Sequence, residues 1–322
     1  MSDRNPSPPA ELGEELQHVD QIGDTAYSKC WLYALLMKVL NLVKSNTTTD
    51  VDEIRELDQE LEEQLCHLLI ATIRLLDAIT REDDSLAEVW CGSALLNAIL
   101  VAQRQMKWLH GSEVEVIHRV LYTFSSNVSG VSALIHSFDQ LLPTFGVYLR
   151  KVCEDEPHLI PFSAYYNSLR AIIPIIDAVA ASLSPAQSVA CCSVDTTVLP
   201  SLVHITLGCQ CQLDEFPLGR GILADLSILF KDLVRSIRDA LKNLTSSSDD
   251  LHTAIDLFEH DLGWLRELDT STDDDHDRVE RLRRAFILCC LNDNDNETRG
   301  QLVYICNRLK LSRLLEEVTD DD

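Results

Sequence analysis

Apolar residues recur at three- and four-residue steps along most of the chain, which is the period of an amphipathic α-helix. The pattern is clearest over residues 50–80, and the apolar face of this stretch includes Val51, Ile54, Leu57, Leu61, Leu65, Leu68, Ile73, Leu76 and Ile79. Acidic residues, among them Glu56, Glu60 and Glu63, fill the opposite face. We therefore expect one long helix here, with a carboxylate-rich face turned to solvent.

The same period predicts further helices, over 25–44, 85–110, 113–126, 131–152, 162–183, 196–207, 218–244, 250–268, 277–291 and 297–318. Proline should break or kink two of them, at Pro143 and Pro174. Alternating strand patterns are absent, and short polar joints favour antiparallel neighbours. The chain is therefore predicted to be all-α, with about eleven helices in an armadillo/HEAT-like or irregular α-solenoid. A large helical bundle is the alternative, because no fixed repeat period emerges.

The domain organisation follows from the same pattern. Residues 1–10 are polar and rich in proline, and we expect a disordered tail there. Residues 11–318 read as a single helical domain, followed by the acidic tail 319–322. Any soft break within the domain is expected near 184–215, a stretch rich in Cys, Ser and Thr.

Charge narrows the classes of partner. The chain holds 27 Lys and Arg against 52 Asp and Glu, a formal net charge of −25. Such a surface repels phosphates, so direct nucleic-acid binding and docking on anionic membranes are not expected. The polar start of the chain has no signal-peptide pattern, and the 11 cysteines are read as reduced thiols. We therefore expect a cytoplasmic or nuclear protein.

The end of the chain resembles a known family. Leu282–Leu291 is an apolar helix end, and a polar stretch then leads through Glu297–Leu302 to the Asn307–Leu315 segment with its Arg-Leu-Lys-Leu sequence. This arrangement is similar to the regulatory armadillo segment of formins, in which a polar loop leads into a helix and an Arg-Leu-x-Leu ending. Lys310 stands where that ending usually has a small turn residue. The resemblance implies an armadillo- or HEAT-like stack and carries over no binding residue.

Candidate chemistry is sparse. The Asp273–Asp277 string resembles the aspartate motif of class I terpene synthases, in which carboxylates hold Mg²⁺ against a diphosphate. It lies in a polar joint, and acids that favour a helix N-terminus explain it better. Cys209 and Cys211 follow His204 closely, but no further ligand completes a zinc site. We therefore assign no catalytic residue, no metal and no cofactor; a helical metal-dependent enzyme using Asp273–Asp277 remains the alternative.

Binding is the function that the sequence favours. Arginines cluster at Arg278, Arg281, Arg283 and Arg284, either as an intrahelical charge ladder or as a local site for an acidic peptide. With Glu56, Glu60 and Glu63, Arg281 and Arg284 are our candidate partner-binding residues. We expect a non-enzymatic scaffold or regulatory adaptor whose groove receives a basic or amphipathic helical segment of a protein partner. An obligate subunit of a larger complex is a further alternative.

Several serines lie beside prolines or acids and are candidates for phosphorylation. Ser7 precedes a proline, whereas Ser247, Ser248 and Ser271 are followed closely by aspartates. Phosphates there would add negative charge at the expected helix starts.

Overall fold

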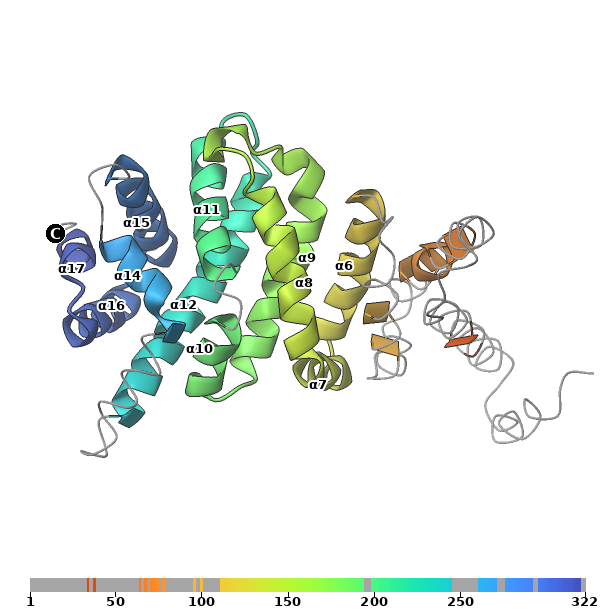
Figure 1. The fold of residues 1–322 in the computed structure, drawn as a ribbon, viewed down its shortest axis with the longest axis horizontal. Helices are drawn as coiled ribbons and strands as arrows, with labels where there is room; N and C mark the ends of the chain where they lie inside the picture. The colour runs from red at the N-terminus through yellow and green to blue at the C-terminus, as the bar shows by residue number, and fades with distance from the viewer. Residues whose placement is uncertain are drawn as a thin grey trace, which may run out of the picture.

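The structure is a computed structural model, and it describes five continuous stretches together with single residues and short runs before residue 111. The five stretches are 111–193, 198–244, 260–270, 276–291 and 295–319. All secondary structure within the described residues is helical. The all-α prediction is therefore confirmed, whereas a regular armadillo or HEAT repeat is not. The helices follow one another along the long axis of the molecule in approximate chain order (Figure 1).

The described residues before position 111 contribute to the core. Those within 64–78 and 95–100 are helical, as the apolar pattern predicts. Ile70, Ile73, Leu95 and Leu96 are all buried in the same core cluster as the later helices. Of the predicted apolar face of the 50–80 helix, Ile73 is buried whereas Leu68 is 44% exposed, so that face is confirmed only in part where the structure describes it.

The first complete helices are α6 (Gly111–Ser125), α7 (Val128–His136) and α8 (Phe138–Val152). The predicted break within 131–152 occurs at Ser137 and not at Pro143, which lies inside α8. The backbone of Ser137 has φ −108° and ψ 8°, outside the α-helical range. Its N–H still donates to the end of α7 while its carbonyl accepts from the first turn of α8, so the two helices join without a loop.

The turn between α6 and α7 depends on two residues, Asn127 and Gly130. Asn127 caps α7 by accepting a 2.7 Å hydrogen bond from the N–H of Gly130. A Cβ atom at Gly130 would lie 2.2 Å from the backbone oxygen of Phe124. Only glycine therefore lets the start of α7 approach the end of α6 this closely.

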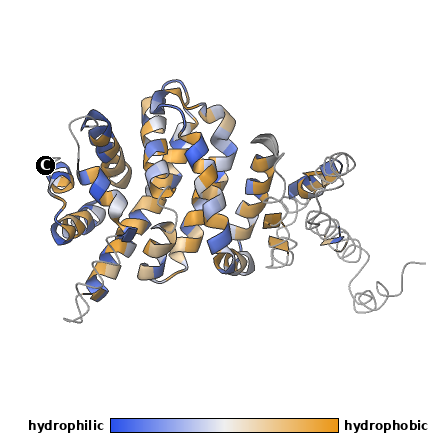
Figure 2. Ribbon diagram, in the orientation of Figure 1, coloured by the Kyte–Doolittle hydropathy of each residue, from blue (hydrophilic) through white to orange (hydrophobic). Residues whose placement is uncertain are grey.

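The centre of the molecule holds the short 3-10 helix η1 and four longer helices. Their bounds are η1 Pro157–Leu159, α9 Phe162–Ala181, α10 Pro185–Ser193, α11 Val198–Cys211 and α12 Gly219–Leu244. Helix α9 packs between α6 and α12, and α11 packs against α8, α12 and α15. Hydrophobic and hydrophilic residues alternate along these helices (Figure 2), and their buried hydrophobic residues belong to one core cluster.

Prolines sit inside two of these helices. Pro174 lies within α9, which continues through it. Pro200 lies in the first turn of α11, where backbone N–H groups have no acceptor within the helix. The N–H that proline lacks therefore costs no hydrogen bond there. Neither proline ends its helix, so these positions do not mark boundaries in this fold.

The chain ends in a cluster of shorter helices, α14 (Gly263–Asp269), α15 (His276–Leu291), α16 (Asn296–Leu309) and α17 (Ser312–Thr319). The single helix predicted over 297–318 is wrong, because the chain turns at Lys310.

Lys310 ends α16 in the left-handed conformation, with φ 58° and ψ 44°. It is the only non-glycine residue with positive φ among those that the structure describes. The new helix α17 is held at its start by Asp269, whose carboxylate accepts a 2.8 Å hydrogen bond from the N–H of Leu314. The Arg-Leu-Lys-Leu segment thus holds a turn where one continuous helix was predicted.

Across the described part of the chain, no individual helix has the length and apolar character that crossing a membrane requires. Helices α10 and α11, which are bent by 78°, meet the test of length and composition only when they are counted together.

Candidate functional site

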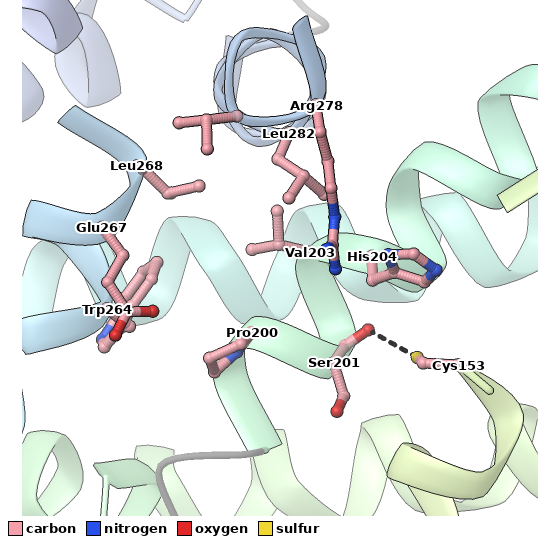
Figure 3. Close-up of a pocket in the computed structure, with 11 residues that line it drawn as sticks. Cys153, Pro200, Ser201, Val203, His204, Trp264, Glu267, Leu268, Arg278 and Leu282 are labelled. Atoms are coloured by element: carbon pink, nitrogen blue, oxygen red, sulfur yellow. Dashed lines mark hydrogen bonds between the residues drawn. The ribbon is translucent and has the colours of Figure 1, made fainter. Parts of the chain in front are cut away.

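A pocket of about 290 Å³ opens between α11, α14, α15 and the C-terminal end of α8. Each of these four helices contributes side chains to its lining. The lining residues are Cys153, Pro200, Ser201, Val203, His204, Trp264, Glu267, Leu268, Arg278, Val279 and Leu282. Figure 3 shows these side chains converging from the different helices.

The apolar wall of the pocket is anchored in the core. Trp264 is 8% exposed and packs edge to face on Phe286, with 5.5 Å between ring centroids. Phe286 packs in the same way on Phe230 of α12, at 5.4 Å. This aromatic chain fixes the wall to the longest helix described, and Val203 and Leu282 face it from α11 and α15 (Figure 3).

His204 and Arg278 lie together at one end of the pocket (Figure 3). The Nε2 of His204 lies 3.4 Å from the carbonyl oxygen of Asp155, which can only accept a hydrogen bond. Nε2 therefore carries the proton. Burial lowers the pKa of His204 below its ordinary value, and the Arg278 guanidinium lowers it further. The imidazole is therefore neutral at pH 7.

Arg278 differs from the neighbouring arginines of α15. Arg283 is buried and donates to the carbonyl of Leu268 at 2.8 Å. Arg284 is paired with Glu280 and Glu317. Among the described residues, Arg278 has neither a hydrogen bond nor an ion pair, and its guanidinium faces the pocket (Figure 3).

The opposite end of the pocket is acidic. Glu267 is exposed and lies beside Trp264 (Figure 3). A second pocket of about 240 Å³ begins there and shares both of these residues with the first. Trp264 and Glu267 therefore contribute to the walls of both pockets.

The thiol in the pocket is poorly suited to nucleophilic attack. Cys153 donates a 3.5 Å hydrogen bond to the carbonyl of Ser201. Burial raises the pKa of Cys153 to about 12, so the thiolate is scarce at neutral pH. The arrangement thus offers apolar contact, a cation and an anion, which are the elements of binding.

Most of the chain resembles a known protein family. The sequence model of the family described as the SAAL1 C-terminal domain matches residues 64–298. The chain belongs to the SAAL1 C-terminal domain family. All residues that line the two pockets lie inside the matched range, whereas Lys310 and α17 lie beyond it.

Individual SAAL1 proteins match over shorter segments. Protein saal1 of Danio rerio is 42% identical over 66 residues, 20% of this chain and 14% of that protein. The protein of the same name from Xenopus tropicalis is 39% identical over 67 residues, with the same coverage of each chain. Protein SAAL1 of Mus musculus is 39% identical over 75 residues, 20% of this chain and 16% of the mouse protein. The aligned part thus spans about one sixth or less of each relative. No solved structure matches the chain, and these findings do not confirm the resemblance to formins.

The predicted partner-binding residues are only partly described. Glu56, Glu60 and Glu63 lie outside the described residues. Arg281 and Arg284 are exposed on α15 but do not line the pocket. Arg281 donates to the carbonyl of Asp277, so both arginines take part in contacts along their own helix. Their role in partner binding stays a prediction.

The other sites proposed from sequence fall largely outside the described residues. Ser7, Ser247, Ser248 and Ser271 do so, as do residues 273–275 of the Asp273–Asp277 string. Asp277 lies in the first turn of α15. Within the residues that are described, no group of three or more His, Cys, Asp or Glu could hold a metal ion.

The cysteines of the described stretches are all unpaired. Cys209 is buried whereas Cys211 is exposed, so the pair does not present two thiols on one face. Sequence reasoning associated His204 with this pair, but the structure places its ring in the pocket beside Arg278. The apolar wall formed by Trp264 and Leu282 carries no sequence signal, because both residues read as ordinary positions of amphipathic helices.

Proposed function

We propose that this chain is a non-enzymatic protein-binding module of the SAAL1 C-terminal domain family. Its binding site is the pocket between α11, α14 and α15, and its ligand is an amphipathic segment of a partner protein. The observation that carries the proposal is an open apolar pocket whose free charges, Arg278 and Glu267, lie at opposite ends. Such a combination suits one anchoring side chain flanked by polar residues.

Two further observations support binding over catalysis. The Cys153 thiol is held protonated by burial, and His204 makes its hydrogen bond to a backbone carbonyl. The net charge of −25 favours a partner whose overall charge is positive, because complementary fields speed association. A scaffold or adaptor role is consistent with all of these features.

Site-specific photocrosslinking tests the proposal. Benzoylphenylalanine is introduced at position 282, inside the pocket, and separately at position 288 on the same helix. Leu288 is 53% exposed and does not line the pocket, so it is a matched control. We expect a crosslinked partner in cells at position 282 that is absent at position 288.

A second substitution, Val279→Asp, makes the test specific. Val279 lines the pocket and is only half-buried, so the new carboxylate charges the pocket wall without entering the core. The adduct at position 282 should disappear in this background while the fold is retained in circular dichroism. Identical adducts at positions 282 and 288, or an adduct that Val279→Asp leaves intact, would rule out the pocket as the binding site.

A further inference from the structure

We infer that the partner segment carries an acidic side chain next to its apolar anchor, with the carboxylate on Arg278 and the anchor between Val203 and Leu282. This inference rests on the proposed function and specifies the chemistry of the ligand. It concerns a local contact, so it is compatible with a partner whose overall charge is positive.

The free guanidinium is the first step of the argument. An arginine has five N–H donors, and those of Arg278 make no hydrogen bond to any described residue. Other arginines of this acidic chain are paired, such as Arg119 with Asp77 at 3.1 Å and Arg170 with Asp225 at 2.7 Å. A pocket-lining cation without such a partner is available to a ligand.

Desolvation supplies the second step. A segment that covers the pocket removes water from Arg278, and an ion that loses water without gaining an acceptor is strongly disfavoured. A carboxylate restores the lost hydrogen bonds in the two-pronged geometry that a guanidinium prefers. A lysine in the same place would meet Arg278 as a like charge and be rejected.

The environment of Arg278 is the third step. His204, the titratable group beside it, is neutral at pH 7 and therefore adds no second positive charge next to Arg278. Cys153 is protonated and uncharged. The carboxylate that does line the pocket, Glu267, lies at the far end beside Trp264 (Figure 3). The positive potential of Arg278 is therefore not cancelled within the described pocket.

The size of the pocket decides how much of the ligand it takes. About 290 Å³ lies at the small end of ligand sites, which suits one apolar side chain and a neighbouring carboxylate better than a large cofactor. Glu267 at the far end then faces the next part of the segment, where a basic residue fits. The expected order along the segment is acidic, apolar and basic.

Selection of random peptides tests this chemistry. Phage-displayed 12-residue peptides are selected on the full chain, and the affinity of a selected peptide is measured by fluorescence anisotropy. We expect an Asp or Glu beside a Leu, Phe or Trp in the selected sequences. Replacing that acid by its amide should weaken binding about five- to thirtyfold, less than the loss of a whole charge-assisted hydrogen bond, because the amide keeps one acceptor oxygen.

Variants of the chain localise the effect. Against Arg278→Gln, the acidic peptide and its amide version should bind equally, whereas Arg281→Gln should retain the preference. Arg281 is a matched control, because it is exposed on the same helix and lies outside the pocket. An amide peptide that binds within twofold of the acidic one, or an equal effect of both variants, would overturn the inference.

Two outcomes separate this inference from the proposed function. If peptides without an acid are selected and their binding is lost in Leu282→Asp but kept in Leu288→Asp, the pocket binds segments and only the inference fails. If no peptide is enriched, or if Leu282→Asp binds the peptides normally, the pocket is not the binding site and both fail. A further outcome overturns the inference by itself. If a preference for acidic peptides appears only after residues 273–275 are changed to Asn, the chain's own carboxylates compete for Arg278 and no acid is required of the partner.

Discussion

A half-buried carboxylate on α9 makes a strong test of the packing between α9 and α12. Asp177 faces two aspartates of α12, Asp225 and Asp232, and its Oδ1 atom is buried without a hydrogen bond among the described residues. Burial first, and then the charges of Asp232 and Asp225, raise the pKa of Asp177 from 3.8 to about 6. The charged form is therefore disfavoured in the folded state.

Replacing this residue by its neutral amide should stabilise the protein. The raised pKa corresponds to at most about 3 kcal/mol, and solvent around a half-buried group reduces this to about 1 kcal/mol. Since the pKa is raised in the folded state, the cost of the charge is full above pH 6 and vanishes below pH 4. Asp177→Asn should thus increase the free energy of unfolding by about 1 kcal/mol at pH 7.5 and by about half of that at pH 5.0.

Urea unfolding followed by circular dichroism measures both values. Asp214→Asn is the control, because Asp214 is exposed in the connection between α11 and α12 and should change stability little at either pH. A neutral or destabilising effect of Asp177→Asn at pH 7.5, or a gain that does not shrink at pH 5.0, would refute the reasoning. Either result would mean that the α9–α12 interface does not hold these carboxylates as described.

Three further predictions use other parts of the structure. Gly130→Ala forces a Cβ onto the backbone of α6 and should cost about 3 kcal/mol, whereas Gly300→Ala, in an open helical position, should add about 1 kcal/mol; urea unfolding compares the two. Asp269→Ala removes the acceptor for the N–H of Leu314 and should speed hydrogen exchange at that amide, whereas Asp269→Asn should preserve most of its protection. Acidic peptides selected for the pocket should bind more tightly as the pH falls from 7 to 5, because a bound carboxylate raises the lowered pKa of His204; His204→Gln should flatten this dependence, which anisotropy titrations detect.

The helical class was predictable because burial acts on every turn of an amphipathic helix. Ile73 of the predicted apolar face is buried, as its spacing indicates, whereas Leu68 of the same face is 44% exposed. The predicted range 113–126 differs from α6 by one or two residues at each end, as frayed helix ends allow. Local periodicity therefore carries the information for these elements.

The helix breaks were harder to predict, because they depend on tertiary contacts. Proline is the strongest local signal, yet Pro143 and Pro174 lie inside continuous helices. The chain turns instead at Ser137 and Lys310, neither of which is a residue that breaks helices by itself. At Lys310, the contact of Asp269 with the start of α17 holds a backbone conformation that the lysine would seldom adopt alone.

The pocket could not be assembled from the sequence for a related reason. Its residues come from positions 153, 200–204, 264–268 and 278–282, and no spacing rule joins such distant segments. Tryptophan and leucine are residue types that usually fill a core. Trp264 and Leu282 differ from other such residues in that the pocket lies beside them. Of the pocket residues, Arg278 and His204 were singled out from the sequence, the first in the arginine cluster of α15 and the second beside a cysteine pair that does not line the pocket.

The arginine cluster shows how helix geometry divides one sequence feature into separate functions. Steps of about 100° per residue turn neighbouring arginines to different surroundings. Arg283 points inward and donates to the carbonyl of Leu268, and Arg284 points outward to carboxylates of α15 and α17. Arg278, one to two turns earlier, faces the pocket and has no such partner among the described residues. A cluster that reads as a single basic patch is thus divided among the core, the carboxylates of α15 and α17 and the pocket, and the proposed function uses the arginine that faces the pocket.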